Sequence, residues 1–237
     1  PRHSMKIGIL NTDAVKPEFA AKFGEYPDMF AGLLLAVDPQ LELVTYEVVT
    51  NEYPADLDEV DAYIITGSKL SVYDDVPWIN QLKDFVRDLH RAKKKIVGIC
   101  FGHQLIAEAL GGKTSKAEVG WCVGVHKSTL TAEAADYGID ASDFQLLSNH
   151  QDQVQKMAVG GKLLAGTESC PIAMTAVGEH ILTFQGHPEF AKPYARALLD
   201  MRREIFGETL YQKAVSSLQQ ETDQLQVGRW ILDFISH

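Results

Sequence analysis

A cysteine between two glycines is the first feature of this sequence that could do chemistry. Cys100 lies in Gly98-Ile99-Cys100-Phe101-Gly102, at the end of the short apolar run Lys95–Ile99. Such a run predicts a buried strand, and glycine tolerates the positive φ and the close backbone approach of a sharp strand-to-helix turn. A helix beginning at this turn would favour the thiolate through its N-terminal N–H groups. Cys100 is therefore a candidate nucleophile, although a lone buried cysteine is as often a packing residue.

A second motif, near the end of the chain, could supply the base that a cysteine nucleophile needs. Gln185-Gly186-His187-Pro188-Glu189 follows the run 180–184, which predicts another buried strand. Side chains two residues apart on an extended segment point to the same side, so Glu189 could hold one ring nitrogen of His187. The other nitrogen could then exchange a proton with a thiol. By itself, a His-Pro-Glu sequence is more often structural.

Together, the two motifs resemble those of the class I glutamine amidotransferase family, in a stand-alone form similar to the glutaminase part of GMP synthase. Two further segments carry the resemblance, Thr66-Gly67-Ser68 with Ser71-Val72-Tyr73, and Ser148-Asn149-His150-Gln151-Asp152. The first is similar to the family's oxyanion loop, and the second to the segment that closes over bound glutamine. The four motifs follow the family's order along most of the chain.

The resemblance implies a role for each matching residue. Cys100 would attack the side-chain amide of glutamine to form a γ-glutamyl thioester, His187 would act as base and then as acid, and Glu189 would orient His187. The backbone N–H groups of Ser68 and Phe101 would hold the oxyanion, although the Cβ of Ser68 restricts the conformations in which its N–H faces the site. The other residues expected to bind substrate are Gly67, Gln104, Asn149, Gln151 and Asp152. No metal and no cofactor is expected.

The remaining histidines and cysteines near these motifs are not expected to be catalytic. His103 should pack or lie on a helix surface, and His150 should form hydrogen bonds in a loop. Cys122 and Cys170 have no base-bearing motif beside them and are interpreted as packing residues. Three cysteines without metal-ligand spacing do not indicate a disulfide framework, so the cytoplasm is the expected compartment.

The elements that must position these residues follow an α/β pattern. Strands are expected at 5–10, 41–49, 62–65 and 95–99, and helices at 14–37, 77–89 and 103–110. Short strands follow at 120–129, 144–148, 162–166, 172–177 and 180–184. The expected fold is an open α/β sandwich with a mostly parallel central sheet, a flavodoxin-like core and an antiparallel extension, as in class I glutamine amidotransferases.

A single domain over residues 5–237 is expected, since 237 residues suffice for one large α/β core. Helices from about residue 192 onward, at 194–206, 209–218 and 222–235, carry no recognisable chemistry. An apolar set in the last of them should pack on the chain's own surface: Leu225, Trp230, Ile231, Phe234 and Ile235. Residues 1–4, before Met5, are expected to be a cloning remnant.

Charge and motif content narrow the partners and leave three functions open. A formal net charge of −10 argues against nucleic-acid and membrane partners, and no apolar stretch approaches the length of a membrane span. No P-loop or adenylation motif is present, so ammonia from glutamine would pass to a separate synthetase subunit. The alternatives are a γ-glutamyl peptidase or transferase acting on γ-glutamyl peptides by the same thioester chemistry, and a non-catalytic binding or regulatory module.

Overall fold

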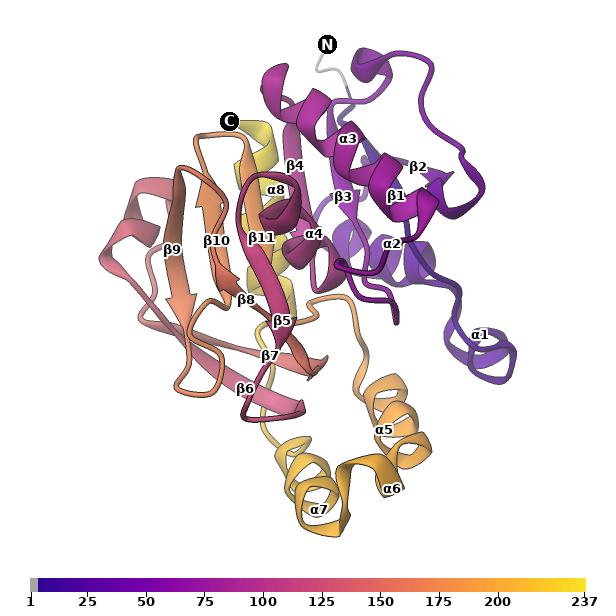
Figure 1. Ribbon diagram of the computed structural model, residues 1–237, viewed down its shortest axis with the longest axis vertical. Helices are drawn as coiled ribbons and strands as arrows, with labels where there is room; N and C mark the ends of the chain where they lie inside the picture. Colours follow the sequence, from indigo (N-terminus) through magenta and orange to yellow (C-terminus); the bar gives the residue numbers. More distant parts are fainter. Residues whose placement is uncertain (1–3) are drawn as a thin grey trace.

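A nine-stranded mixed sheet organises the computed structural model, which describes residues 4–237 (Figure 1). The parallel strands are β1 (Lys6–Asn11), β2 (Glu42–Glu47), β3 (Ala62–Ile65), β4 (Lys95–Ile99) and β11 (Ile181–Phe184). The antiparallel strands are β10 (Met174–Val177), β9 (Gly161–Gly166), β6 (Cys122–Leu130) and β7 (Asp143–His150). The strand order is β2-β1-β3-β4-β11-β10-β9-β6-β7. The expected parallel core with an antiparallel extension is therefore confirmed.

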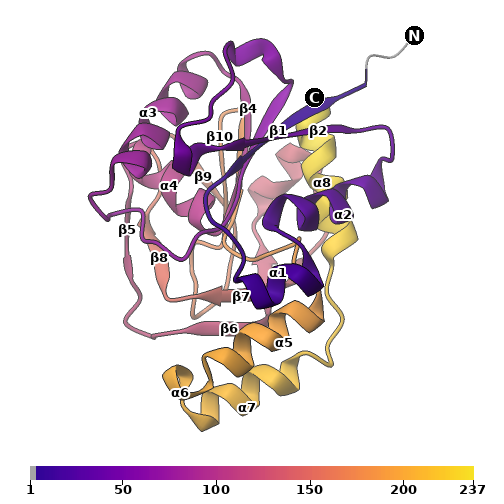
Figure 2. The same cartoon turned by 90° about the vertical axis from the view of Figure 1, so that its right-hand side faces the viewer.

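Helices cover both faces of the parallel strands, as Figure 2 shows. On one face lie α3 (Pro77–Arg91) and α4 (Phe101–Ala109), and on the other α2 (Tyr26–Val37) and α8 (Gln224–Ser236). Neighbouring strand residues point to opposite faces, so Ile64 packs toward α2 and α8 while Ile65 packs toward α3 and α4. Burial on both faces explains why these strands are nearly continuous apolar runs.

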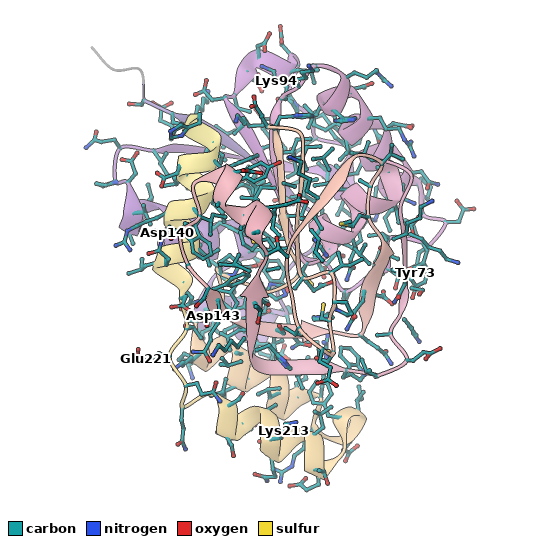
Figure 3. The ribbon with its side chains drawn as sticks, turned by 90° about the vertical axis from the view of Figure 1, so that its left-hand side faces the viewer. Tyr73, Lys94, Asp140, Asp143, Lys213 and Glu221 are labelled. Atoms are coloured by element: carbon teal, nitrogen blue, oxygen red, sulfur yellow. The ribbon has the colours of Figure 1, made fainter. Side chains whose placement is uncertain are left out.

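Three further helices lie at the end of the molecule beside β6 and β7 (Figure 1), and they are α5 (Lys192–Met201), α6 (Arg203–Phe206) and α7 (Glu208–Ser217). α1 (Pro17–Phe23) lies apart from this end and packs Phe19 against Tyr194 of α5. Leu199 of α5 and Tyr211 of α7 share a small apolar core with Val123 of β6. Figure 3 shows Lys213 of α7 at this end of the molecule and Glu221 on the segment that leads back to α8. The chain thus leaves the sheet after β11 and returns to it with α8.

The structure departs from the expected elements in three places. Gly24, with φ 82°, separates α1 from α2 within the helix expected at 14–37. The helix expected at 194–206 is interrupted at Arg202, whose φ and ψ are −106° and 15°. A second, two-stranded sheet joins β5 (Lys113–Lys116) to β8 (Asp152–Lys156). Its strands were not expected, because their polar sequences lack the alternation of a half-buried strand.

Other expectations about packing are largely confirmed. Four residues of the apolar set in α8 are buried, whereas Leu225 is 47% exposed. Cys122 and Cys170 are buried and unpaired. Of the remnant expected at residues 1–4, all but Ser4 lies outside the described residues. Within residues 4–237, the helices are too short or too polar to cross a membrane.

Two glycines let the turn after β4 pass close to β3. A Cβ on Gly98 would lie 2.6 Å from the carbonyl oxygen of Gly102, and a Cβ on Gly102 would lie 2.5 Å from that of Ile65. The positive φ of the turn, 54°, belongs to Cys100 itself. The glycines therefore provide close approach, as expected, while the uncommon backbone conformation falls on the cysteine and stores strain there.

This packing predicts that Gly102→Ala destabilises the protein. The added methyl group must displace the backbone of β3, so the free energy of unfolding should fall by about 1–3 kcal/mol. Urea unfolding followed by circular dichroism measures the change. Gly32→Ala in α2 is the matched control, since its Cβ would meet no atom within 4 Å, and it should be neutral or stabilising. Equal unfolding midpoints for the two variants would contradict the prediction.

Candidate active site

The carboxyl ends of three adjacent parallel strands bring the sequence motifs together. β4 lies between β3 and β11 in the sheet. Thr66-Gly67-Ser68 follows β3, Cys100 follows β4, and the segment 185–189 follows β11. The backbone N–H of Cys100 donates to the carbonyl of Phe184, the last residue of β11, at 2.8 Å. Motifs far apart in sequence therefore meet at one edge of the sheet.

His187 and Glu189 form a buried pair. Nδ1 of His187 lies 3.1 Å from Oε2 of Glu189, and the side chains are 5% and 0% exposed. Oε1 of Glu189 is buried and has no hydrogen-bond partner among the described residues. The imidazole stacks on the ring of Phe190, with ring centroids 3.8 Å apart. The backbone N–H of His187 donates to the carbonyl oxygen of Leu147 at 2.8 Å. Packing and hydrogen bonding thus fix the orientation of the imidazole.

Gly67 lies beside both His187 and Cys100. A Cβ built on this glycine would lie 3.2 Å from Cε1 of His187 and 3.7 Å from Cβ of Cys100. The imidazole and the cysteine therefore surround one point next to the loop that follows β3. A larger residue at position 67 would occupy the space in front of them.

The surroundings of His187 favour its protonated form. Burial acts against the imidazolium, but the charge of Glu189, the charge of Cys100 and hydrogen bonds to both outweigh it and raise the pKa of His187 to about 10. Below that pH, Nδ1 donates a hydrogen bond to Glu189. The ring then carries a positive charge beside the sulfur of Cys100.

A chain of amide side chains supports the cysteine from behind. Nε2 of Gln185 lies 3.5 Å from Sγ of Cys100 and can donate to it. Oε1 of Gln185 accepts a hydrogen bond from Nε2 of Gln104 at 3.1 Å, and the same Nε2 donates to the carbonyl of Asp152 at 2.8 Å. Gln104 therefore links β8 to the cysteine through Gln185, the first residue of the second motif, to which the sequence analysis assigned no role.

Thr12, which follows β1, holds the loop after β3. Its hydroxyl lies 2.9 Å from the Gly67 carbonyl oxygen and 3.1 Å from that of Thr66, and its N–H donates to the Thr66 hydroxyl at 2.9 Å. In a trans peptide the N–H points opposite to the carbonyl, so a fixed Gly67 carbonyl also fixes the N–H of Ser68. Ser68 is not among the described residues with positive φ, so its Cβ introduces no strain.

A cleft of about 270 Å³ opens in front of these groups. Eight of the ten site residues expected from the sequence line it: Gly67, Ser68, Cys100, Gln104, Asn149, Gln151, Asp152 and His187. The other two lie behind the cleft wall, where the ring of Phe101 packs against Trp78 and Glu189 is covered by His187. The structure therefore brings all ten to one place.

The carboxylate of Asp152 ties β8 to the loop after β3. Its two oxygens accept hydrogen bonds from the Ser71 hydroxyl at 2.6 Å and from the Tyr73 hydroxyl at 2.7 Å. Tyr73 lies at the surface of the molecule, where Figure 3 labels it. These hydrogen bonds hold a negative charge at the rim of the cleft.

The sequence prediction for His150, a residue near the cleft, does not agree with the structure. His150 is the last residue of β7 rather than a loop residue, and neither ring nitrogen has a hydrogen-bond partner among the described residues. Burial, together with the charge of His187, lowers its pKa to about 3. The expected hydrogen-bonding role of His150 is therefore wrong, because strand pairing turns the ring into the interior.

His103 is buried, which agrees with one of the two placements expected for it. One of its ring nitrogens lies 2.7 Å from the Thr183 hydroxyl and the other 3.2 Å from the Ile172 carbonyl oxygen.

The remaining wall of the cleft comes from segments in which the sequence showed no motif. Trp121 precedes β6, Leu198 lies on α5 and Arg202 follows α5. Tyr26 and Lys116 also line this wall, whereas Lys69 lines the cleft from within the loop after β3. Neither composition nor periodicity singles out such residues, because only tertiary packing places them beside Cys100.

Comparisons with known proteins agree with this architecture. The family model for glutamine amidotransferase class-I matches residues 30–200. A glutamine amidotransferase-like protein of Schizosaccharomyces pombe is 34% identical over 243 residues, covering 97% of this chain and 98% of its own. Gamma-glutamyl peptidase 3 of Arabidopsis thaliana is 30% identical over 214 residues, 85% of each chain. A solved glutamine amidotransferase from Thermotoga maritima has a TM-score of 0.76 over 99% of this chain and 97% of its own, at 12% identity, and therefore shares the fold.

The buried pair predicts an unusual titration of His187. Its imidazole should remain protonated until the pH approaches 10. Glu189→Gln should lower the pKa of His187, because it removes the carboxylate charge that opposes the effect of burial. Because the pKa of His187 is higher in the folded protein than its ordinary value of 6.5, protonation of His187 stabilises the fold. This stabilisation is fully present below pH 6.5 and is lost as the pH rises through about 10. NMR titration of the ring measures the pKa, with His103 as the unchanged control. Titration of wild-type His187 near 6.5 would contradict the prediction.

Proposed function

Because this chain belongs to the class I glutamine amidotransferase family, we propose that it hydrolyses a γ-glutamyl amide bond through a cysteine thioester. One observation supports the proposal: Cys100 and His187 lie together beside Gly67, and Glu189 lies at hydrogen-bond distance from Nδ1 of His187. A protonated His187 stabilises the thiolate of Cys100, and the thiolate is the nucleophilic form. The three residues then act as nucleophile, acid and base, and orienting carboxylate.

The reaction proceeds in two halves. The thiolate of Cys100 attacks the γ-carbonyl carbon, and the tetrahedral intermediate breaks its C–N bond as His187 gives a proton to the leaving nitrogen. The product is a γ-glutamyl thioester. His187 then takes a proton from water, the hydroxide adds to the thioester carbon, and the C–S bond breaks. Glutamate leaves and Cys100 returns to the thiolate.

Two backbone N–H groups stabilise the negative oxygen of both tetrahedral intermediates. Phe101 begins α4, so its N–H has no acceptor within the helix. The N–H of Ser68 is oriented by the hydrogen bond from Thr12 to the Gly67 carbonyl. A donor of this kind typically contributes roughly 3 kcal/mol of transition-state stabilisation.

We favour γ-glutamyl peptides as substrates. Trp121, Leu198 and Arg202 line the same cleft as Cys100 and His187, and a leaving molecule of ammonia would not need this additional space. A relative in Arabidopsis thaliana bears the name gamma-glutamyl peptidase 3. In this reading the leaving group is an amino acid or a short peptide.

Glutamine is the second candidate substrate, since it presents the same γ-carbonyl to Cys100. The relative in Schizosaccharomyces pombe, which matches nearly the full chain, bears the name of a glutamine amidotransferase-like protein. In this case ammonia would pass to a separate synthetase subunit. Either reaction suits the cytoplasm, because unpaired cysteines such as the three of this chain are typical of a reducing compartment.

Variants of the proposed catalytic residues test the mechanism. Cys100→Ala should abolish release of glutamate from γ-glutamylalanine and from glutamine, and no γ-glutamyl adduct should be detected by mass spectrometry. Glu189→Gln should lower kcat by roughly 10²- to 10⁴-fold and leave some activity, because His187 keeps its place but loses its orienting charge. Full activity of the Cys100→Ala protein would refute the proposal, and inactivity of the wild type on both compounds would favour a non-catalytic module.

Thr12 provides a test of the oxyanion site. Thr12→Val removes the hydroxyl that holds the Gly67 carbonyl, so kcat should fall by roughly tenfold or more, with little change in KM. Thr12→Ser keeps the hydroxyl and should restore kcat to near the wild-type value. Urea unfolding of both variants separates this effect from loss of stability. A kcat that is equal in the valine and serine variants would exclude the positioning role of Thr12.

A further inference from the structure

We propose that Arg202, together with Trp121 and Lys116, forms a subsite for the carboxylate of the leaving group. The substrates would then be γ-glutamyl peptides with a free C-terminal carboxylate. This inference rests on the proposed function, because it requires Cys100 to cleave a γ-glutamyl bond. It adds a specificity-determining residue from the C-terminal helices, a region without a sequence motif.

Neutral groups hold Arg202 at the cleft. Its Nη1 donates to Oδ1 of Asn149 at 3.1 Å, and its guanidinium carbon lies 5.5 Å from the centre of the Trp121 ring. No carboxylate within the described chain lies at ion-pair distance from Arg202, whereas Arg196 pairs with Asp200 nearby. A guanidinium has several N–H donors, so one bond to Asn149 leaves others for a carboxylate. Arg202 is thus positioned without being neutralised.

Three cationic side chains and one carboxylate, that of Asp152, line the cleft of this negatively charged protein. The formal net charge of the chain is −10, yet Lys69, Lys116 and Arg202 all line this cleft. Lys69 is 3.5 Å from a carboxylate oxygen of Asp13, while Lys116, like Arg202, has no ion-pair partner within residues 4–237. Unpaired cations in a cleft attract and orient an anionic group. A peptide carboxylate is such a group.

The leaving group must extend toward α5. His187 protonates the leaving nitrogen, so that nitrogen lies beside the imidazole. The imidazole stacks on Phe190, and Leu198 of α5 and Arg202 line the same cleft. The backbone N–H of His187 is bonded to Leu147 of β7, and Asn149, which binds Arg202, lies two residues further along the same strand. These two anchor points are about 7 Å apart, a length that one or two amino-acid residues span.

Matched acids and amides test the subsite directly. The substrates are γ-glutamylalanine and γ-glutamylalanylglycine, each as the free acid and as the C-terminal amide, with glutamine as a substrate whose leaving group carries no carboxylate. Wild-type kcat/KM should be roughly ten- to a hundredfold higher for at least one acid than for its amide. Arg202→Gln should abolish this preference, because it should lower the rate on the acid far more than the rates on the amide and on glutamine. Arg202→Lys should keep part of the preference, since it retains the charge but not the two-pronged geometry.

The control is Arg196→Gln, which removes the same charge from α5 at an exposed position that does not line the cleft. It should preserve the preference for the acid. Equal wild-type rates on acid and amide would overturn the subsite and leave the proposed function intact. An equal loss on glutamine, amide and acid in Arg202→Gln would also overturn it, because Arg202 would then serve the γ-glutamyl part.

Binding to the Cys100→Ala protein distinguishes failure of the subsite from failure of catalysis. Calorimetry should find tighter binding of the acid than of the amide, and Arg202→Gln in the same background should remove the difference. If the protein binds the free acid and the C-terminal amide of these peptides with equal affinity, the subsite is refuted, whether or not the wild type turns the peptides over. Absence of turnover by the wild type, together with acid-selective binding, would refute the proposed function alone.

Discussion

The parallel pairing of β4 with β3 on one side and β11 on the other is the constraint on which the site depends. Adjacent parallel strands end at the same edge, so three loops from distant parts of the chain meet there. The close approach of Gly98, Gly102 and Ile65 then forces a sharp turn. Cys100 absorbs the uncommon φ of that turn, and the sulfur is held at the start of α4 beside His187.

Burial gives the electrostatics of the site their strength. Glu189 is fully buried, with one oxygen on His187 and the other without a hydrogen-bond partner among the described residues. Its charge is therefore compensated chiefly by a protonated His187, and the pKa of that imidazole rises. His150 lies nearby in the same interior without a carboxylate partner, and its pKa falls instead. The difference between these two buried histidines comes from the neighbours of His187, namely the charges of Glu189 and Cys100 and the hydrogen bonds to both.

The C-terminal helices do more than enlarge the fold. α5 and α7 pack on β6 through Leu199, Tyr211 and Val123, which brings the end of α5 to the cleft. The helix is interrupted at Arg202, and its guanidinium binds Asn149 on β7. A structural interruption and an unpaired cation thus coincide at one wall of the cleft. Variation in this wall could change the substrate without altering the chemistry at Cys100.

The sequence by itself determined the α/β order of elements and the buried strands, because apolar runs are local signals. Its motifs implied the grouping of Cys100, His187 and Glu189 only through their resemblance to a known family, and the parallel pairing of β4 with β11 is what brings these residues together. It did not determine β5 and β8, whose polar residues form strands only by pairing with each other. Tertiary structure alone decided three features, namely the burial of His150, the hydrogen bond from Thr12 to the Gly67 carbonyl and the position of Arg202 at the cleft. Each depends on contacts between residues distant in the chain, and such contacts produce no periodic pattern in the sequence.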